Sequence, residues 1–267
     1  MKNRLQEKIT RARRKGEKLF SAFLTLGYPN LETTQKLILQ FEKEGVDIIE
    51  LGFPFSDPLA DGPTIQYSSE QALKRGVRME DAFQMVRDLR RSGCSVPLVF
   101  FTYLNPIYHY GLRSFVAEAK QAGFDGLLVP DLPPEEERSL QTACRKRNLS
   151  QIFLIAPTTE PKRAKFIAAR SQGFIYYVSL RGVTGARKSL PRDIERNLKT
   201  FRGIFTKPVL IGFGVSNPKQ ARQLSRISDG VIVGSAIVEV LRKSGGKAEA
   251  AVRFVRQMIR AVKSRKR

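Results

Sequence analysis

Eight short apolar runs divide the sequence and leave few folds open to it. They lie at 19–25, 46–52, 97–103, 125–131, 151–157, 174–180, 208–214 and 229–235. Runs that are apolar throughout are typical of parallel strands covered on both faces. Stretches with helical periodicity separate them, among them 33–44, 78–92, 111–122, 134–147, 161–172, 191–203 and 217–226. Eight strands that alternate with helices predict an α/β fold, a closed parallel (βα)8 TIM barrel.

An open, doubly wound parallel sheet is the competing topology. In a dinucleotide-binding sheet a Gly-x-Gly-x-x-Gly turn follows the first strand, and this chain has no such turn there. The length of 267 residues fits one barrel, and no linker or shift in composition marks a boundary. We therefore expect residues 1–267 to form a single TIM-barrel domain.

Positive charge is the extreme value of the composition. The 47 Lys and Arg residues against 25 Asp and Glu residues give a formal net charge of +22. Such a balance is compatible with nucleic acid or an acidic membrane surface as a partner. The basic residues are spread over the polar faces of helical segments, however, and no zinc-finger, RNP-like or basic heptad motif accompanies them. The charge therefore indicates a solvated surface and gives little support to a nucleic-acid partner.

The cysteines and the hydropathy pattern bear on the compartment. Cys94 and Cys144 lie far apart and lack the spacing of metal ligands. No signal-type apolar core follows the basic N-terminus, and no apolar run approaches the ~20 residues of a membrane span. These features predict a cytoplasmic protein that makes no contact with a membrane.

Two carboxylates stand at the end of the second predicted strand. Glu50 interrupts the apolar run in "IIELGFPFSDPLADGPTIQ", and Asp61 follows eleven residues later. Because an unpaired buried carboxylate is unfavourable, Glu50 is either paired inside the protein or used chemically. The active sites of TIM barrels lie at the C-terminal ends of the strands, where both residues fall. The pattern alone leaves open whether Glu50 points into the barrel or outward.

Glycines follow the seventh and eighth strands. "IGFGVSNP" and "VGSAIV" place Gly212, Gly214, Gly234 and Ser235 where barrels commonly bind phosphate through loop amides and a helix N-terminus. The basic loop "SLRGVTGARKS" at 179–189 contains Gly182 and Gly185, which are suitable hinges for a lid. Ordinary tight turns and a loop without a role are the alternatives.

These segments together resemble the tryptophan synthase alpha chain family. The resemblance rests on "FLTLGYP", "ELGFPFSDPLADGPTIQ", "YYVSLRGVTGAR", "GFGVS" and "DGVIVGSAIV", in this order, and spans residues 17 to 256. It implies a (βα)8 barrel that cleaves indole-3-glycerol phosphate to indole and glyceraldehyde 3-phosphate and passes the indole to a beta chain. No cofactor is implied for this chain, since pyridoxal phosphate belongs to the beta-chain partner. The implied assembly is an α2β2 heterotetramer, in which "PFSDP" helps to face the beta chain.

The resemblance also implies roles for individual residues. Glu50 is the acid and base at indole C3 and at the glycerol hydroxyl, and Asp61 holds the indole N–H. Tyr176 is the tyrosine near the substrate, although a register shift of one residue would put Tyr177 in its place. Substrate-binding roles fall on apolar residues around the indole ring, on the residues that hold the phosphate, and on Thr184 in the closing loop. The apolar residues are Phe23, Phe101, Leu128, Ile155 and Phe213, and those that hold the phosphate are Gly185, Gly214, Gly234 and Ser235.

One position departs from the family pattern. Leu180 stands where the family usually has arginine, and Arg181 follows it, which puts the anchoring of the closing loop in doubt. Two other functions stay open at this point. The chain can be a free-standing indole-3-glycerol phosphate lyase, or a basic binding protein that has lost the chemistry. The presence of both carboxylates and the glycine loops argues against the binding protein.

Overall fold

The computed structural model describes residues 3–136, 138–178, 195, 198, 200, 201, 203–212 and 214–264. All eight strands are parallel, and each is hydrogen-bonded to the next, with β8 closing onto β1. The predicted (βα)8 barrel is therefore confirmed. The strands are β1 (Leu19–Thr25), β2 (Ile48–Gly52), β3 (Leu98–Phe101), β4 (Gly126–Leu128), β5 (Ser150–Ile155), β6 (Ile175–Val178), β7 (Val209–Gly212) and β8 (Gly230–Val233).

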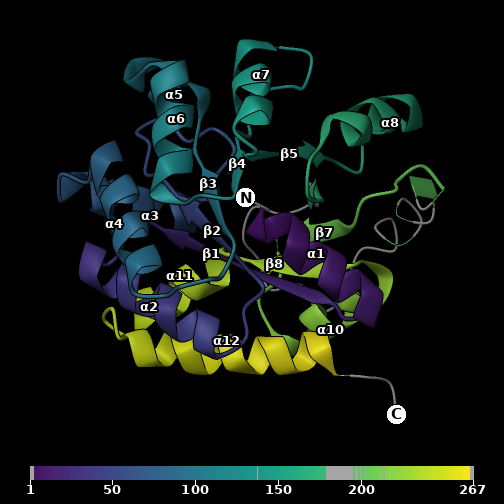
Figure 1. The fold of residues 1–267 in the computed structure, drawn as a ribbon. Coiled ribbons are helices and arrows are strands. Elements are labelled where there is room, and N and C mark those ends of the chain that lie inside the picture. Colours follow the sequence, from purple (N-terminus) through teal and green to yellow (C-terminus); the bar gives the residue numbers. More distant parts are fainter. Residues whose placement is uncertain are drawn as a thin grey trace.

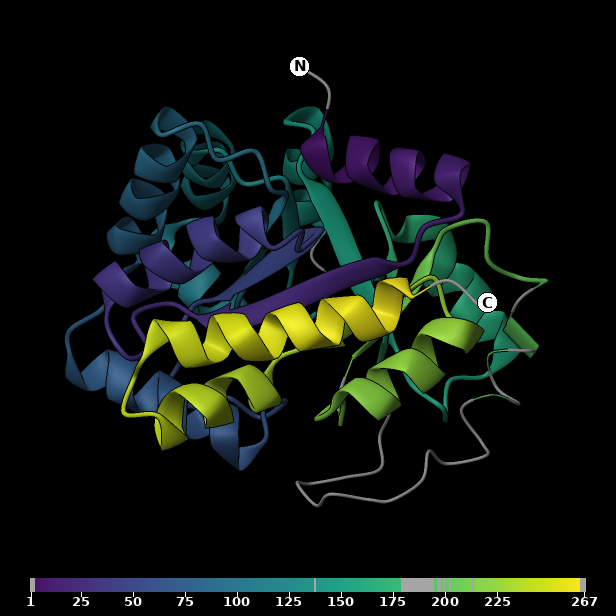
Figure 2. The same ribbon diagram turned by 90° about the horizontal axis from the view of Figure 1, so that it is seen from below.

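Helices surround this barrel in the part of the chain that the structure describes (Figure 1). Their bounds are α1 (Arg4–Lys15), α2 (Leu31–Lys43), α3 (Pro63–Lys74), α4 (Met79–Arg91), α5 (Leu104–Tyr110), α6 (Leu112–Ala122), α7 (Arg138–Lys146), α8 (Pro161–Arg170), α10 (Pro218–Ile227), α11 (Ser235–Lys243) and α12 (Ala248–Lys263). Figure 2 shows the long α12 running beside α10, which it contacts together with α2.

The predicted helices at 33–44, 78–92, 111–122, 134–147, 161–172 and 217–226 correspond to α2, α4, α6, α7, α8 and α10. Most of the predicted segment at 191–203 lies outside the described residues. The sequence pattern did not predict α1, α3, α5, α11 and α12. Two of these, α3 and α11, directly follow the loops that carry the candidate site, so they position its residues.

The strand register decides which side chains face the barrel interior. Side chains alternate between the two faces of a strand, and residues paired in register on neighbouring strands point to the same face. A residue that points into the barrel therefore shows that its register partners point inward as well. Glu50 pairs with Phe23 of β1 and Val99 of β3, and Tyr176 of β6 pairs with Leu154 and Leu210. These residues share the inner face. The outer face packs on helices, as where Phe100 contacts Phe83, Phe115 and Phe124.

Helix α1 closes the N-terminal end of the barrel. Asn3 caps this helix by accepting the amide N–H groups of Leu5 and Gln6, and its own amide donates to the carbonyl of Asp125. Asp125 is fully buried just before β4 and accepts from Arg4, from Arg90 of α4 and from the amide of Leu98. One carboxylate thus ties α1, α4 and the start of β3 together at the end of the barrel opposite the strand C-termini.

No helix among the described residues is both long and apolar enough to cross a membrane. Several cations of the surface helices are paired, for example Lys36 with Glu249 and Arg256 with Glu44. Pairing of this kind at an exposed surface has little effect on stability.

Replacing Asp125 with alanine should lower the free energy of unfolding by about 3–5 kcal/mol, because Arg90 would keep a largely buried charge without its partner. Urea unfolding followed by circular dichroism measures the change. Glu249→Ala is the matched control, since it breaks an exposed ion pair with Lys36 and should unfold close to the wild type. Equal stability of the two variants would contradict this role of Asp125.

Candidate active site

Glu50 lies inside the barrel, which answers the question that the sequence left open. Its side chain is fully buried on the inner face of β2. The hydroxyl of Ser21 on β1 donates to Oε1 of Glu50 over 2.8 Å, whereas Oε2 has no hydrogen-bond partner among the described residues. Burial raises the pKa of Glu50 to about 8, and the hydrogen bond from Ser21 lowers it in part. At neutral pH this residue is therefore mainly a neutral carboxylic acid.

Asp61 is half-buried in the loop that connects β2 to α3. Its Oδ2 accepts a hydrogen bond of 3.1 Å from the hydroxyl of Tyr103, and that hydroxyl accepts the amide N–H of Ala60 over 3.0 Å. The ring of Tyr103 also packs on Phe55 in the same loop. Burial raises the pKa of Asp61 to about 6, and the bond from Tyr103 opposes this rise. Asp61 therefore remains mostly ionised at neutral pH.

Tyr176 faces the interior from the opposite side of the barrel. Its hydroxyl lies over Gly212 of β7, so closely that a Cβ atom at that glycine would stand 2.3 Å from the hydroxyl oxygen. Burial raises the pKa of Tyr176 well above its usual value, and the negative charges of Glu50 and Asp61 raise it further. Tyr176 is therefore close enough to both carboxylates for their charges to act on its hydroxyl.

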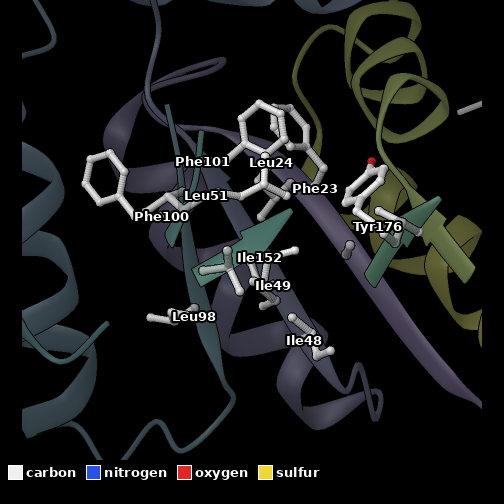
Figure 3. Close-up of a cluster of buried hydrophobic side chains, with 14 of the residues drawn as sticks. Phe23, Leu24, Ile48, Ile49, Leu51, Leu98, Phe100, Phe101, Ile152 and Tyr176 are labelled. Carbon is white, nitrogen blue, oxygen red and sulfur yellow. The ribbon is translucent and has the colours of Figure 1, made fainter. Parts of the chain in front are cut away.

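Two phenylalanines line the same end of the barrel. The rings of Phe23 and Phe101 meet edge to face with centroids 5.4 Å apart, and Figure 3 shows them side by side near Leu24. Two glycines flank Phe23. A Cβ at Gly52 would lie 2.3 Å from the Phe23 ring, which excludes a side chain there, and a Cβ at Gly234 would make a tight contact of 3.1 Å with the Phe23 Cβ. Side chains at these glycines would fill the space that the aromatic rings occupy.

The apolar wall continues onto β4 and β5, with one change from the prediction. Leu128 pairs with Phe101 and shares its inner face. Ile155 pairs with Tyr177 and Leu154 pairs with Tyr176, so strand alternation turns Leu154 inward and Ile155 toward the helices. The expectation that Ile155 borders the interior is corrected in favour of Leu154. The C-terminal part of this strand, "FLIA" at 153–156, contains no polar residue to mark its faces.

The glycine loops after β7 and β8 both lie at the C-terminal ends of their strands. Gly214 is exposed with φ +77°, a left-handed conformation that favours glycine. Gly234 is the N-cap of α11 and offers no capping side chain, and Ser235 is the first residue of this helix. The amides of the first turn of α11 therefore have no side-chain cap and add to the positive end of the helix dipole.

The predicted residues Thr184, Gly185 and Phe213 lie outside the described residues. The same holds for the whole of the loop 179–189, including Leu180 and Arg181. Their predicted roles stay predictions.

In the described part of the chain no cluster of three or more histidine, cysteine, aspartate or glutamate side chains could hold a metal ion. His109 is exposed on α5, away from the interior carboxylates. A cavity of about 360 Å³ lies at the other end of the barrel, below α1, where Leu19, Val209 and Asp229 mark the starts of strands. Its position at the N-terminal face separates it from the carboxylates, and barrel active sites lie at the C-terminal face.

The arrangement can therefore move a proton. Glu50 carries a proton at neutral pH and has one oxygen without a partner, while Asp61 supplies a negative charge. Titratable groups whose environments push their pKa values apart are typical of acid and base catalysis. Apolar and aromatic side chains beside them exclude water and fit a flat, apolar substrate group.

Three residues of this site were not predicted from the sequence: Ser21, Tyr103 and Leu154. The sequence could have indicated Ser21, because it lies two residues before Phe23 and therefore points to the same face of β1 as Phe23. Tyr103 follows β3, where its position near the barrel mouth was predictable but its contact with the Asp61 loop was not.

Comparisons with known proteins agree with this geometry. The family model described as Tryptophan synthase alpha chain matches residues 9–266. The tryptophan synthase alpha chain of Geotalea uraniireducens is 46% identical over 233 residues, which cover 87% of each chain, and that of Citrifermentans bemidjiense is 45% identical over 244 residues, 91% of each chain. The crystal structure of tryptophan synthase subunit alpha from Legionella pneumophila superposes with a TM-score of 0.90 at 33% identity, over 98% of this chain and 99% of that one.

The buried state of Glu50 makes stability depend on pH. The folded pKa of about 8 exceeds the ordinary value of 4.5, so the folded protein holds the extra proton between these values. The contribution of the Glu50 proton to the free energy of unfolding is complete below pH 4.5. It decreases above this value and is lost as the pH rises through 8. Glu50→Gln removes this loss. Relative to the wild type, its free energy of unfolding should rise by about 5 kcal/mol across this window.

Urea unfolding of both proteins at a series of pH values measures this difference. The raised pKa of Asp61 is the same in the wild type and in Glu50→Gln, so the effect of Asp61 on stability cancels when the two proteins are compared. Glu249→Gln, at an exposed position, serves as the control and should run parallel to the wild type. Parallel curves for Glu50→Gln as well would mean that Glu50 is ionised in the folded protein at neutral pH.

Proposed function

Since the chain belongs to the tryptophan synthase alpha chain family, lyases that cleave indole-3-glycerol phosphate to indole and glyceraldehyde 3-phosphate, we propose that Glu50 and Asp61 carry out this cleavage at the C-terminal end of the barrel. One observation carries the proposal: Glu50 is buried and protonated, with Oε1 held by Ser21 and Oε2 without a partner. A proton donor in this state is what the first step of the reaction requires.

The proton balance of the reaction needs only one shuttling group. Oε2 of Glu50 gives its proton to C3 of the indole ring, which leaves a cationic ring and a Glu50 carboxylate. The carboxylate then takes the proton of the glycerol hydroxyl on the adjoining carbon. The C–C bond breaks as this hydroxyl becomes the aldehyde of glyceraldehyde 3-phosphate, and the bond electrons restore the aromatic indole. Glu50 ends as it began, protonated.

Asp61 stabilises the charge that develops during this cycle. Protonation at C3 places positive charge on the ring nitrogen, and an ionised carboxylate that accepts the indole N–H offsets it. The hydrogen bond from Tyr103 supports this role, because it holds the carboxylate in place and opposes the rise of the Asp61 pKa. We place Tyr176 as a third catalytic residue, beside both carboxylates.

The remaining residues bind the two ends of the substrate. Phe23, Phe101, Leu128 and, in place of Ile155, Leu154 surround the indole ring, with Phe213 as an expected further contact. Gly214, Gly234 and Ser235, with Gly185, hold the phosphate, and the uncapped first turn of α11 supports this assignment. Thr184 is expected to close over Asp61.

This cleavage proceeds by proton transfer alone, so we assign this chain no cofactor. Pyridoxal phosphate belongs to the beta chain in our proposal. We further propose that residues 1–267 form a single domain of a cytoplasmic enzyme. Cys94 and Cys144 fit a reducing compartment, since both are buried free thiols whose pKa values burial raises to about 11 and about 12.

We propose a beta chain as the partner, in an α2β2 assembly. Exposed apolar side chains support a partner near the mouth of the barrel. Leu59, in the Asp61 loop, is 93% exposed, and Tyr108, on α5 after β3, is 51% exposed. Both follow strand C-termini, so a protein bound here would lie over the exit through which indole leaves.

Glu50→Gln should lower kcat for cleavage by roughly 10²- to 10⁴-fold with little change in KM, since the amide keeps the size of the side chain but cannot carry the proton. Asp61→Asn should also lose most activity, because an amide offers no negative charge to the cationic ring. Single-turnover assays of indole release measure both. Asp57→Asn, an exposed carboxylate of the same loop, is the control and should cleave normally. A folded Glu50→Gln protein with near wild-type kcat would remove Glu50 from the mechanism.

Gly234→Leu should raise KM for indole-3-glycerol phosphate by at least ~10-fold. The new side chain would press on Phe23, whose Cβ lies 3.1 Å from the position of a Cβ at Gly234, and would obstruct the first turn of α11. Steady-state kinetics with a thermal unfolding check distinguishes this from misfolding. Gly203→Leu, where nothing lies within 4 Å of an added Cβ, is the control. An unchanged KM in Gly234→Leu would exclude this loop from phosphate binding.

A further inference from the structure

We propose that Ser21 is a positioning residue for this reaction: its hydroxyl fixes Oε1 of Glu50, assigns proton transfer to Oε2 and keeps the carboxyl group able to act as both acid and base. The inference rests on the proposed role of Glu50 and deepens it, because it explains how one buried carboxyl group serves two opposite steps.

The geometry separates the two oxygens of Glu50. Ser21 and Glu50 lie on adjacent strands, and both side chains are fully buried on the inner face. The serine hydroxyl donates to Oε1 over 2.8 Å, and Oε2 is buried with no hydrogen-bond partner in the described part of the chain. A hydroxyl that donates to Oε1 leaves the acidic proton of Glu50 on Oε2. The oxygen without a hydrogen-bond partner is therefore the one that carries the proton.

The surroundings of Glu50 leave this task to Ser21. The register neighbours of Glu50 are Phe23 on β1 and Val99 on β3, which offer no hydrogen bond. Glu50 and Asp61 both act on the pKa of Tyr176, and neither Tyr176 nor Asp61 can supply positive charge to Glu50. Among the described residues no cation acts on the pKa of Glu50. Ser21 is the only described group that acts to lower the pKa of Glu50. Without it, burial alone sets the pKa.

Both steps of the reaction depend on the pKa and on the orientation of the Glu50 carboxyl group. A carboxyl group with a higher pKa is a weaker acid and gives its proton to C3 more slowly. A carboxyl group free to rotate also places either oxygen toward the substrate, which lowers the population of the reactive geometry. Loss of the serine hydroxyl should therefore reduce kcat without reducing the affinity for the substrate.

The test compares Ser21 with cysteine, a weak donor, and alanine, which has none. The pH profile of kcat, measured for the alpha chain with saturating indole-3-glycerol phosphate, should fall at high pH as Glu50 loses its proton. In Ser21→Ala this limb should move upward by about one pH unit, with kcat at neutral pH about tenfold lower and KM unchanged. In Ser21→Cys the position of the high-pH limb and the value of kcat should lie between those of the wild type and those of Ser21→Ala. Ser228→Ala, which removes a buried serine hydroxyl at the other end of the barrel, should leave the profile unchanged.

An unshifted limb in both Ser21 variants, with kcat within twofold of the wild type, would overturn the inference and make Ser21 a packing residue. Should Ser21→Ala unfold, the smaller change in Ser21→Cys decides the matter by the same criterion. Failure of the proposed function looks different, because Glu50→Gln would then remain active. An inactive Glu50→Gln together with an unshifted Ser21→Ala profile refutes the role of Ser21 alone.

Discussion

The removal of Glu50 from water is the constraint on which the candidate site depends. The closed barrel puts the side chain among apolar residues, and no cation is among the groups that act on its pKa in the described residues. A carboxyl group in such a place is neutral at the pH where an exposed one would be ionised. Burial in the barrel thereby makes Glu50 a proton donor. It also lowers the free energy of unfolding at pH values above the ordinary pKa of glutamate.

Hydrogen bonds, rather than ion pairs, adjust both carboxylates. Ser21 donates to Glu50 and Tyr103 donates to Asp61, each from a neighbouring strand or its end. The two groups differ in burial, and the difference separates their pKa values. Ion pairs stabilise the N-terminal end of the barrel, for example at Asp125, which connects α1 and α4 to this end. Stability and chemistry are thus assigned to opposite ends of the same strands.

The barrel was predictable because eight predominantly apolar runs alternate with helical segments, and strands that are apolar on both faces are typical of a parallel sheet covered on both sides. Residues of the site with a distinct chemical type, such as Glu50 and Asp61, were predictable as well. The choice between Leu154 and Ile155 was not, since two adjacent apolar residues differ only in the register that the neighbouring strands impose. The bond from Tyr103 to Asp61 joins residues 42 positions apart, and no local pattern encodes such a contact.

The protonation state of Glu50 is the central claim, and infrared difference spectroscopy tests it most directly. The spectrum of the wild type minus that of Glu50→Gln isolates the absorption of this one carboxyl group. We expect the band of the protonated carboxyl group to persist at neutral pH and to disappear with a midpoint near the pKa of about 8 that burial produces. A midpoint near the ordinary value of 4.5 would mean that Glu50 is ionised when the enzyme works, and that another group gives the proton to the indole ring.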